Sequence, residues 1–154
     1  MNYSKSPLLY QDEPTYGLFL KLIIMIVPVA SIVGGVIIFL SGDNSGGLVL
    51  LTEAFIVSLL FWCVFPRKYQ VYEEHLRIVL GGPFSVKVGF GQIKKIGPGT
   101  STFTMNFITK FTKNYIEINK KKGLSIAITP RDNATFIENA NEAFNQWVKA
   151  HPNK

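Results

Sequence analysis

The side chains of this 154-residue chain that could bind another molecule are mainly lysines, and they gather in two short clusters. Lys94 and Lys95 are adjacent, and Lys120, Lys121 and Lys122 form a triplet directly before a glycine. Grouped ammonium ions attract phosphate and carboxylate groups, and near an anionic lipid leaflet each could contribute about 1 kcal/mol. A solvated surface that only keeps the protein soluble is the alternative. These five lysines are therefore candidate residues for an anionic partner.

Side chains that could support catalysis or hold a metal are scattered. His75 lies in a predicted turn and His151 in the tail; neither has the spacing of a metal ligand, and we expect both to be solvated. The single cysteine, Cys63, lies in an apolar run without an activating base. No phosphate-binding glycine loop or nucleophile elbow occurs. The sequence predicts a protein that is not an enzyme, with no cofactor, no metal and no small-molecule substrate.

Another ionisable residue, Glu53, lies inside an apolar stretch. Residues 17–40 and 48–65 are two apolar runs, separated by the polar break 41–47. A helix rises about 1.5 Å per residue and the hydrocarbon core is about 30 Å thick, so each run can cross or nearly cross a membrane. A buried helix pair in a soluble protein is the alternative, but the apolar residues show no 3.6-residue stripe. We therefore expect a transmembrane helical hairpin over residues 17–66.

Four small residues of the first run are candidate helix-packing positions. Ala30 with Gly34, and Ser31 with Gly35, are spaced so that another backbone could approach closely, either the second run or another copy of the chain. Glu53 is the fifth candidate, because an ionisable group within a membrane helix is a functional hypothesis by default. Its position a few residues after the break favours the alternative, a carboxylate that reaches water at the membrane surface.

The charges that flank the runs predict an orientation. Lys21, Arg67 and Lys68 lie at one end of the hairpin, and the break carries no Lys or Arg. By the positive-inside rule, both termini are cytoplasmic. The first run is too long for the apolar core of a signal peptide and a second run follows, so we expect no cleavage. A membrane tether also disfavours nucleic acid as the partner of the basic residues.

The rest of the chain, residues 67–154, alternates in short segments divided by turns, which predicts about seven antiparallel strands in a small sandwich or barrel. The predicted strands lie at residues 68–72, 76–80, 84–90, 93–96, 103–109, 115–119 and 124–129. Apolar residues then recur at helical spacing from Phe136 to Val148, with Thr129 as the expected N-cap and Pro130 as the first helical residue. The fold class is therefore α+β. Residues 1–16 are interpreted as an extended or loosely ordered arm.

This order of elements resembles the bacterial pleckstrin-homology-like (PH-like) domains. The resemblance covers about residues 67–150 and depends on the segments KYQVYEEHLRIVLGG, FGQIKKI and ITPRDNATFIENAN. The positions that match the family pattern are Ile93, Ile96, Thr129, Pro130, Asp132, Phe136 and Ile137. Members of that family often carry two membrane spans ahead of the domain, as this chain does. These motifs are structural and not catalytic.

The resemblance implies a seven-stranded antiparallel barrel or sandwich, capped by the C-terminal helix, on the cytoplasmic side of a prokaryotic inner membrane. It further implies a non-enzymatic scaffolding module that binds proteins or anionic lipid headgroups, and family members often associate with themselves. The alternative is an accessory subunit of a larger membrane complex, with Glu53 and the small residues as the working surface. The expected partners are thus membrane lipids and a second copy or another membrane protein.

Overall fold

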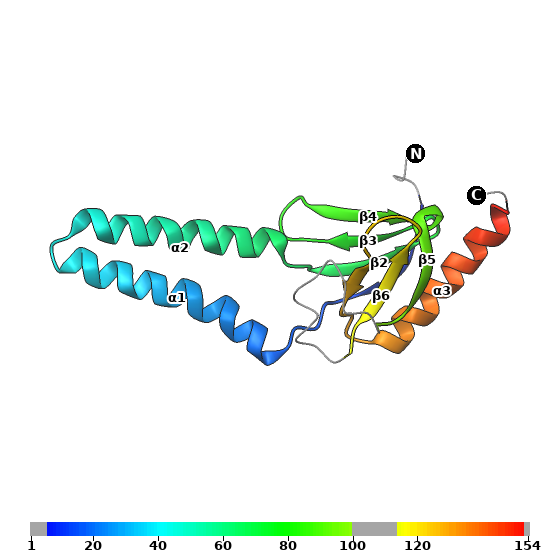
Figure 1. The fold of residues 1–154 in the computed structure, drawn as a ribbon, viewed down its shortest axis with the longest axis horizontal. Coiled ribbons are helices and arrows are strands. Elements are labelled where there is room, and N and C mark those ends of the chain that lie inside the picture. Colours follow the sequence, from blue (N-terminus) through cyan, green and yellow to red (C-terminus); the bar gives the residue numbers. More distant parts are fainter. Residues whose placement is uncertain (1–5, 100–113, 153–154) are drawn as a thin grey trace. The chain divides into compact units, whose positions relative to one another are not determined.

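The computed structural model describes residues 6–99 and 114–152, and the chain divides into two compact units (Figure 1). One unit is the helical hairpin Gly17–Phe65. The other combines the segment before Gly17 with the chain from Pro66 onward. Both ends of the hairpin therefore lead into the same β-rich unit.

The hairpin consists of two long helices, α1 (Leu18–Leu40) and α2 (Asn44–Val64). The expectation that the polar break extends to residue 47 is wrong, since α2 begins four residues before the predicted start at 48. The Asp43 side chain accepts a hydrogen bond of 2.9 Å from the backbone N–H of Gly46 and so caps the helix. This cap stabilises a glycine-containing first turn that the composition alone predicts to be irregular.

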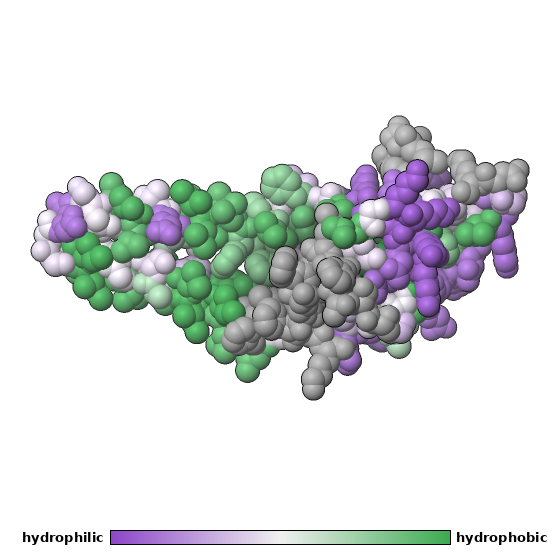
Figure 2. Space-filling view, viewed as in Figure 1, coloured by the Kyte–Doolittle hydropathy of each residue, from purple (hydrophilic) through white to green (hydrophobic). Residues whose placement is uncertain are grey.

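Both helices are long and apolar enough to cross a membrane, over Lys21–Leu40 and Asn44–Val64. Very few of their residues are buried within the structure, in contrast to the core helices of soluble proteins. Figure 2 shows hydrophobic residues along most of the hairpin, with hydrophilic ones near its connecting end, whereas hydrophilic residues gather on the β-rich unit. This distribution suits an apolar solvent around the helices.

The β-rich unit contains two antiparallel sheets. The first has the strand order β1 (Leu8–Asp12), β2 (Lys68–Tyr72), β3 (His75–Val79) and β4 (Ser85–Gly89). A short 3-10 helix, η1 (Phe90–Gln92), leads into the second sheet, with the order β5 (Ile93–Pro98), β6 (Ile116–Lys120) and β7 (Ile126–Ile128). The helix α3 (Asn133–Ala150) follows and contacts β1, β2 and β5.

A single apolar core fills the space between the sheets and α3. The first sheet contributes alternate residues such as Val71 and Leu76, and the second contributes Ile116 and Ile118, all almost completely buried. The helix adds the buried residues Phe136, Ala140, Ala143 and Trp147, at the spacing of one helical face. The predicted apolar stripe of the last helix is thus confirmed, except that Val148 is exposed.

Six of the predicted strands are confirmed, as β2 to β7. Each observed end lies within two residues of the predicted end. The predicted strand 103–109 lies outside the described residues. The first strand, β1, was not predicted, because residues 1–16 were interpreted as an arm apart from the domain. Leu8–Asp12 instead forms an edge strand that pairs with β2, with an irregular register between Leu8 and Tyr10.

Several contacts attach the segment before the hairpin to the domain. The rings of Tyr10 and Phe136 meet edge to face with centroids 6.0 Å apart. The backbone N–H of Thr15 donates to the carbonyl of Thr129 at 2.7 Å, and the N–H of Arg131 donates to the carbonyl of Glu13 at 2.9 Å. These contacts join residues more than a hundred positions apart in the sequence, so no local pattern in residues 1–16 indicates them.

The predicted N-cap of the last helix is also wrong. The cap is Asp132, whose carboxylate accepts hydrogen bonds from the backbone N–H of Thr135 at 3.1 Å and from its hydroxyl at 2.7 Å. Thr129 is buried, and Pro130 forms an isolated bridge with Pro14 and lies before the helix. The carbonyl of Thr129 and the N–H of Arg131 bond to the N-terminal segment, and the N–H of Thr129 donates to the hydroxyl of Tyr69. The helix therefore begins three residues later than expected.

Candidate functional site

The two predicted lysine clusters lie on neighbouring strands of the second sheet. β5 pairs antiparallel with β6, with Ile93 opposite Lys120 and Lys95 opposite Asn119. A register shift between Ile93 and Lys95 places Lys94 at an irregularity of the strand, where both Lys94 and Lys95 are exposed. The structure therefore brings together, at one end of β5 and β6, two clusters that are separated by 24 residues of sequence.

The β6–β7 hairpin holds the lysine triplet at this end of the sheet. Gly123 has a φ of +85°, a conformation that L side chains rarely adopt, so the turn requires glycine there. Across the hairpin, the hydroxyl of Ser125 donates a hydrogen bond of 2.6 Å to the side-chain oxygen of Asn119. The backbone N–H of Lys121 donates to the carbonyl of Gln92 at 2.8 Å, which ties the turn to η1.

A surface hollow forms where the turn meets η1. Its lining consists of Gly91, Gln92, Lys120, Lys121 and Lys122. Lys121 and Lys122 are exposed and Lys120 is half-buried. We name the five predicted lysines, together with Gly91 and Gln92, the basic patch. Sequence analysis did not include Gly91 and Gln92, although they directly precede Ile93 and Lys94 in the chain.

The polar side chains of the basic patch are of only two kinds, lysine and glutamine. Its side chains are ammonium groups and one amide, which donate hydrogen bonds and attract phosphate or carboxylate oxygens. Among the described residues, no group of three or more His, Cys, Asp or Glu is arranged to hold a metal ion.

One of the two histidines does not lie where we expected. The prediction that His75 is solvated is wrong: its exposed fraction is 2%, and its ring stacks on that of Tyr72 with centroids 4.7 Å apart. Burial lowers the pKa of His75, and the positive charge of Lys87 adds to this effect. His151 is half-buried against Trp147, with ring centroids 4.8 Å apart. Both rings pack against aromatic neighbours within the domain.

The candidate residues of the hairpin lie on different faces of the helices. Gly35 is buried, and a Cβ there would lie 3.0 Å from Leu51 and 3.2 Å from the carbonyl of Gly47. A Cβ at Gly34 would meet nothing within 4 Å. Ser31 is half-buried and Ala30 is exposed. The contact between the helices thus uses Gly35 with the second-helix residues Gly47 and Leu51, which sequence analysis did not single out.

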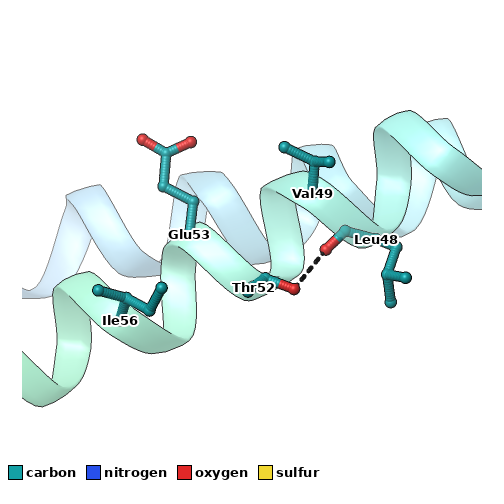
Figure 3. A pocket seen from close by; sticks show the side chains of 5 residues that line it. All are labelled: Leu48, Val49, Thr52, Glu53 and Ile56. Atoms are coloured by element: carbon teal, nitrogen blue, oxygen red, sulfur yellow. Dashed lines mark hydrogen bonds between the residues drawn. The ribbon is translucent and has the colours of Figure 1, made fainter.

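Glu53 is exposed on α2, next to the buried Ala54. Figure 3 shows its carboxylate on the same side of α2 as Val49, in a shallow hollow that is also lined by Leu48, Thr52 and Ile56. The hydroxyl of Thr52 donates to the carbonyl of Leu48 at 2.8 Å. The carboxylate is therefore the one ionisable group in a hollow of otherwise apolar character.

The family model of the bacterial PH domain matches residues 67–143 of the chain. The matched segment begins just before β2 and ends within α3, and it includes all five lysines of the basic patch. No curated protein and no solved structure matches the chain.

Proposed function

The chain belongs to the bacterial PH domain family, and from this premise we propose that it is a membrane-anchored, non-enzymatic binding module whose basic patch binds anionic groups of proteins or lipid headgroups. PH-like domains are generally non-catalytic, and the described residues hold no group of three or more His, Cys, Asp or Glu that could bind a metal ion. The single observation that carries the proposal is the β5–β6 register, which puts Lys94 and Lys95 at the same end of the second sheet as the lysine triplet.

The anchor in this proposal is the α1–α2 hairpin, embedded in a prokaryotic cytoplasmic membrane with both flanks on the cytoplasmic side. The length and apolar surface of both helices support the embedding. The pairing of β1, before the hairpin, with β2, after it, supports a common side for both flanks. The absence of Lys and Arg from residues 41–47 supports the cytoplasmic assignment.

The proposal is tested with the full-length chain in nanodiscs of neutral lipid. Binding is measured to vesicles that contain phosphatidylglycerol and, in a second arm, to an acidic peptide. Lys94→Glu with Lys122→Glu reverses two exposed charges of the patch. We expect this variant to bind at least about tenfold more weakly at low salt, because each basic residue near an anionic surface contributes about 1 kcal/mol.

The matched control reverses Lys68 and Lys149, which are exposed but lie at the start of β2 and in the last turn of α3. It changes the net charge by the same amount, so it distinguishes binding at the basic patch from a general attraction between the positively charged protein and the anionic probe. Equal binding by the two variants in both arms would refute the basic patch as a site. Loss in only one arm would assign the patch to lipid or to protein.

A second function, an accessory subunit of a larger membrane complex, is favoured by one observation. Glu53 lies on the exposed face of α2 and not between the two helices of the hairpin. An ionisable side chain on a lipid-facing surface is costly, whereas a subunit can use it to contact another helix. Isolation in mild detergent, with a stoichiometric unrelated partner as the expected result, tests this function.

A further inference from the structure

The inference concerns the hollow around Glu53, and it rests on the membrane embedding proposed above. The position of Glu53 along α2 gives its depth. α2 begins at Asn44, so Glu53 lies nine positions into the helix, or about 13 Å along its axis. Half of the hydrocarbon core is about 15 Å thick. With the whole of Asn44–Val64 embedded, as proposed above, this carboxylate lies close to the middle of the apolar layer.

Nothing within the described hairpin compensates for the charge. Glu53 makes no hydrogen bond or ion pair with any described residue, and the nearest polar side chain, Thr52, already donates its proton to the carbonyl of Leu48. Lys21 is the only Lys, Arg or His between residues 17 and 65. It lies near the start of α1, at the opposite end of the hairpin from the connection at residues 41–43.

The chemistry of the missing partner follows from the orientation of the spans. Two copies in one membrane with the same topology place Glu53 of one chain at the depth of Glu53 of the other, so a second copy brings a carboxyl group to that depth and no cation. Neither copy can bring Lys21 to that depth. A cationic side chain at the depth of Glu53 must therefore come from a different polypeptide.

We propose that the hollow formed by Leu48, Val49, Thr52, Glu53 and Ile56 docks a transmembrane helix of another protein, which carries a Lys or Arg side chain at the depth of Glu53. The apolar residues Leu48, Val49 and Ile56 contact the body of this helix, and the Glu53 carboxylate pairs with its cation. Such a pair removes the cost of an isolated carboxylate in lipid and also fixes the depth of the partner.

The test uses the full-length chain in neutral-lipid vesicles, labelled with a donor dye, and synthetic Leu/Ala transmembrane helices labelled with an acceptor dye. One probe carries a single Lys nine residues from one end, and the matched probe carries Leu there. Energy transfer reports association. We expect the Lys probe to associate with the chain about tenfold more tightly than the Leu probe, which corresponds to about one charge pair in a membrane.

The conservative variant Glu53→Gln should reduce association of the Lys probe to that of the Leu probe, whereas Phe55→Leu, at an exposed residue of α2 outside the hollow, should leave it unchanged. Equal association of both probes with the wild-type chain, or an unchanged preference in Glu53→Gln, would overturn the proposal. Energy transfer between copies of the chain that depends on Glu53 and exceeds the transfer to either probe would also overturn the proposal.

A carbonate wash of the same vesicles tests the membrane embedding separately from the docking of a partner helix. If the wash removes the chain, the membrane embedding is wrong and the docking inference falls with it. If the chain resists the wash and the Lys probe shows no preference, the embedding stands and only the docking inference is refuted.

Discussion

Two neighbouring glycines of α1, Gly34 and Gly35, show how strongly a single helical position decides the role of a residue. A Cβ at Gly35 would contact α2, whereas a Cβ at Gly34 would enter open space. The closest approach involves Gly47 of α2, where a Cβ would lie 2.6 Å from the Cβ and 2.7 Å from the backbone nitrogen of Phe39. Backbone atoms cannot move aside alone, so the two helices would have to separate.

The substitution Gly47→Ala should therefore destabilise the hairpin. Overpacking of a close contact typically costs about 1–3 kcal/mol, and a fall in the thermal unfolding temperature in detergent measures it. Gly34→Ala is the matched control and should unfold at or slightly above the wild-type temperature, because alanine favours a helix and meets no neighbour. Equal stability of the two variants would contradict the observed helix contact.

For single residues, the sequence predicted which residue types take part in packing better than it predicted what each residue contacts. The spacing of Ala30, Ser31, Gly34 and Gly35 indicates close packing, but adjacent helical residues differ by about 100° around the axis, and spacing alone does not say which of them faces the partner. His75 shows the same limit. A histidine beside two glutamates suggests a solvated turn, and only the tertiary structure places its ring against Tyr72.

Among the elements, α3 depends on a cap that also connects it to β1. The Asp132 carboxylate accepts two hydrogen bonds from Thr135, and the backbone N–H of Asp132 donates to the carboxylate of Asp12 at 2.9 Å. The hydrogen bonds from Thr135 lower the pKa of Asp132 below its usual value of 3.8. A carboxyl whose pKa is lower in the folded protein stabilises it above the unfolded pKa, and this contribution is lost as the pH falls.

We accordingly predict that Asp132→Ala lowers the unfolding temperature of the domain at pH 7 and makes less difference as the pH falls below about 4. Asp132→Asn should retain most of the stability at pH 7, because asparagine is also a good N-cap. Thermal unfolding followed by circular dichroism at both pH values measures this. A difference between Asp132→Ala and wild type that stays constant with pH would contradict the role of the ionised carboxylate.

The strands and helices were predictable wherever a local pattern is sufficient. The alternation in β2 and β3 and the apolar stripe of α3 both arise from residues close in sequence. β1 was missed because its partner β2 lies beyond both helices of the hairpin. The basic patch was predicted as two separate clusters, because its assembly depends on the β5–β6 register and on the irregularity between Ile93 and Lys95.

At the scale of the whole molecule, the β1–β2 pairing predicts the topology of the proposed membrane protein. Three variants in a Cys63→Ser background each carry one cysteine. Ser6→Cys lies before the hairpin, Ser45→Cys in the first turn of α2, and Lys149→Cys in the last turn of α3. In spheroplasts, a membrane-impermeant maleimide should label only Ser45→Cys, and permeabilisation should expose the other two. Labelling of Lys149→Cys or Ser6→Cys in intact spheroplasts would contradict a common cytoplasmic side.

The connection of β1 to β2 through two helices also constrains the order of events during synthesis. β1 leaves the ribosome first, yet its neighbour in the sheet emerges only after α1 and α2 have both been translated. Until then, the first strand has nothing to pair with, and the core lacks Tyr10 against Phe136. In a membrane protein of this design, the domain could be completed only after both helices had inserted. A chain whose second helix failed to insert would keep β1 and β2 on opposite sides of the bilayer. Its incomplete sheet would then be exposed to cellular proteases.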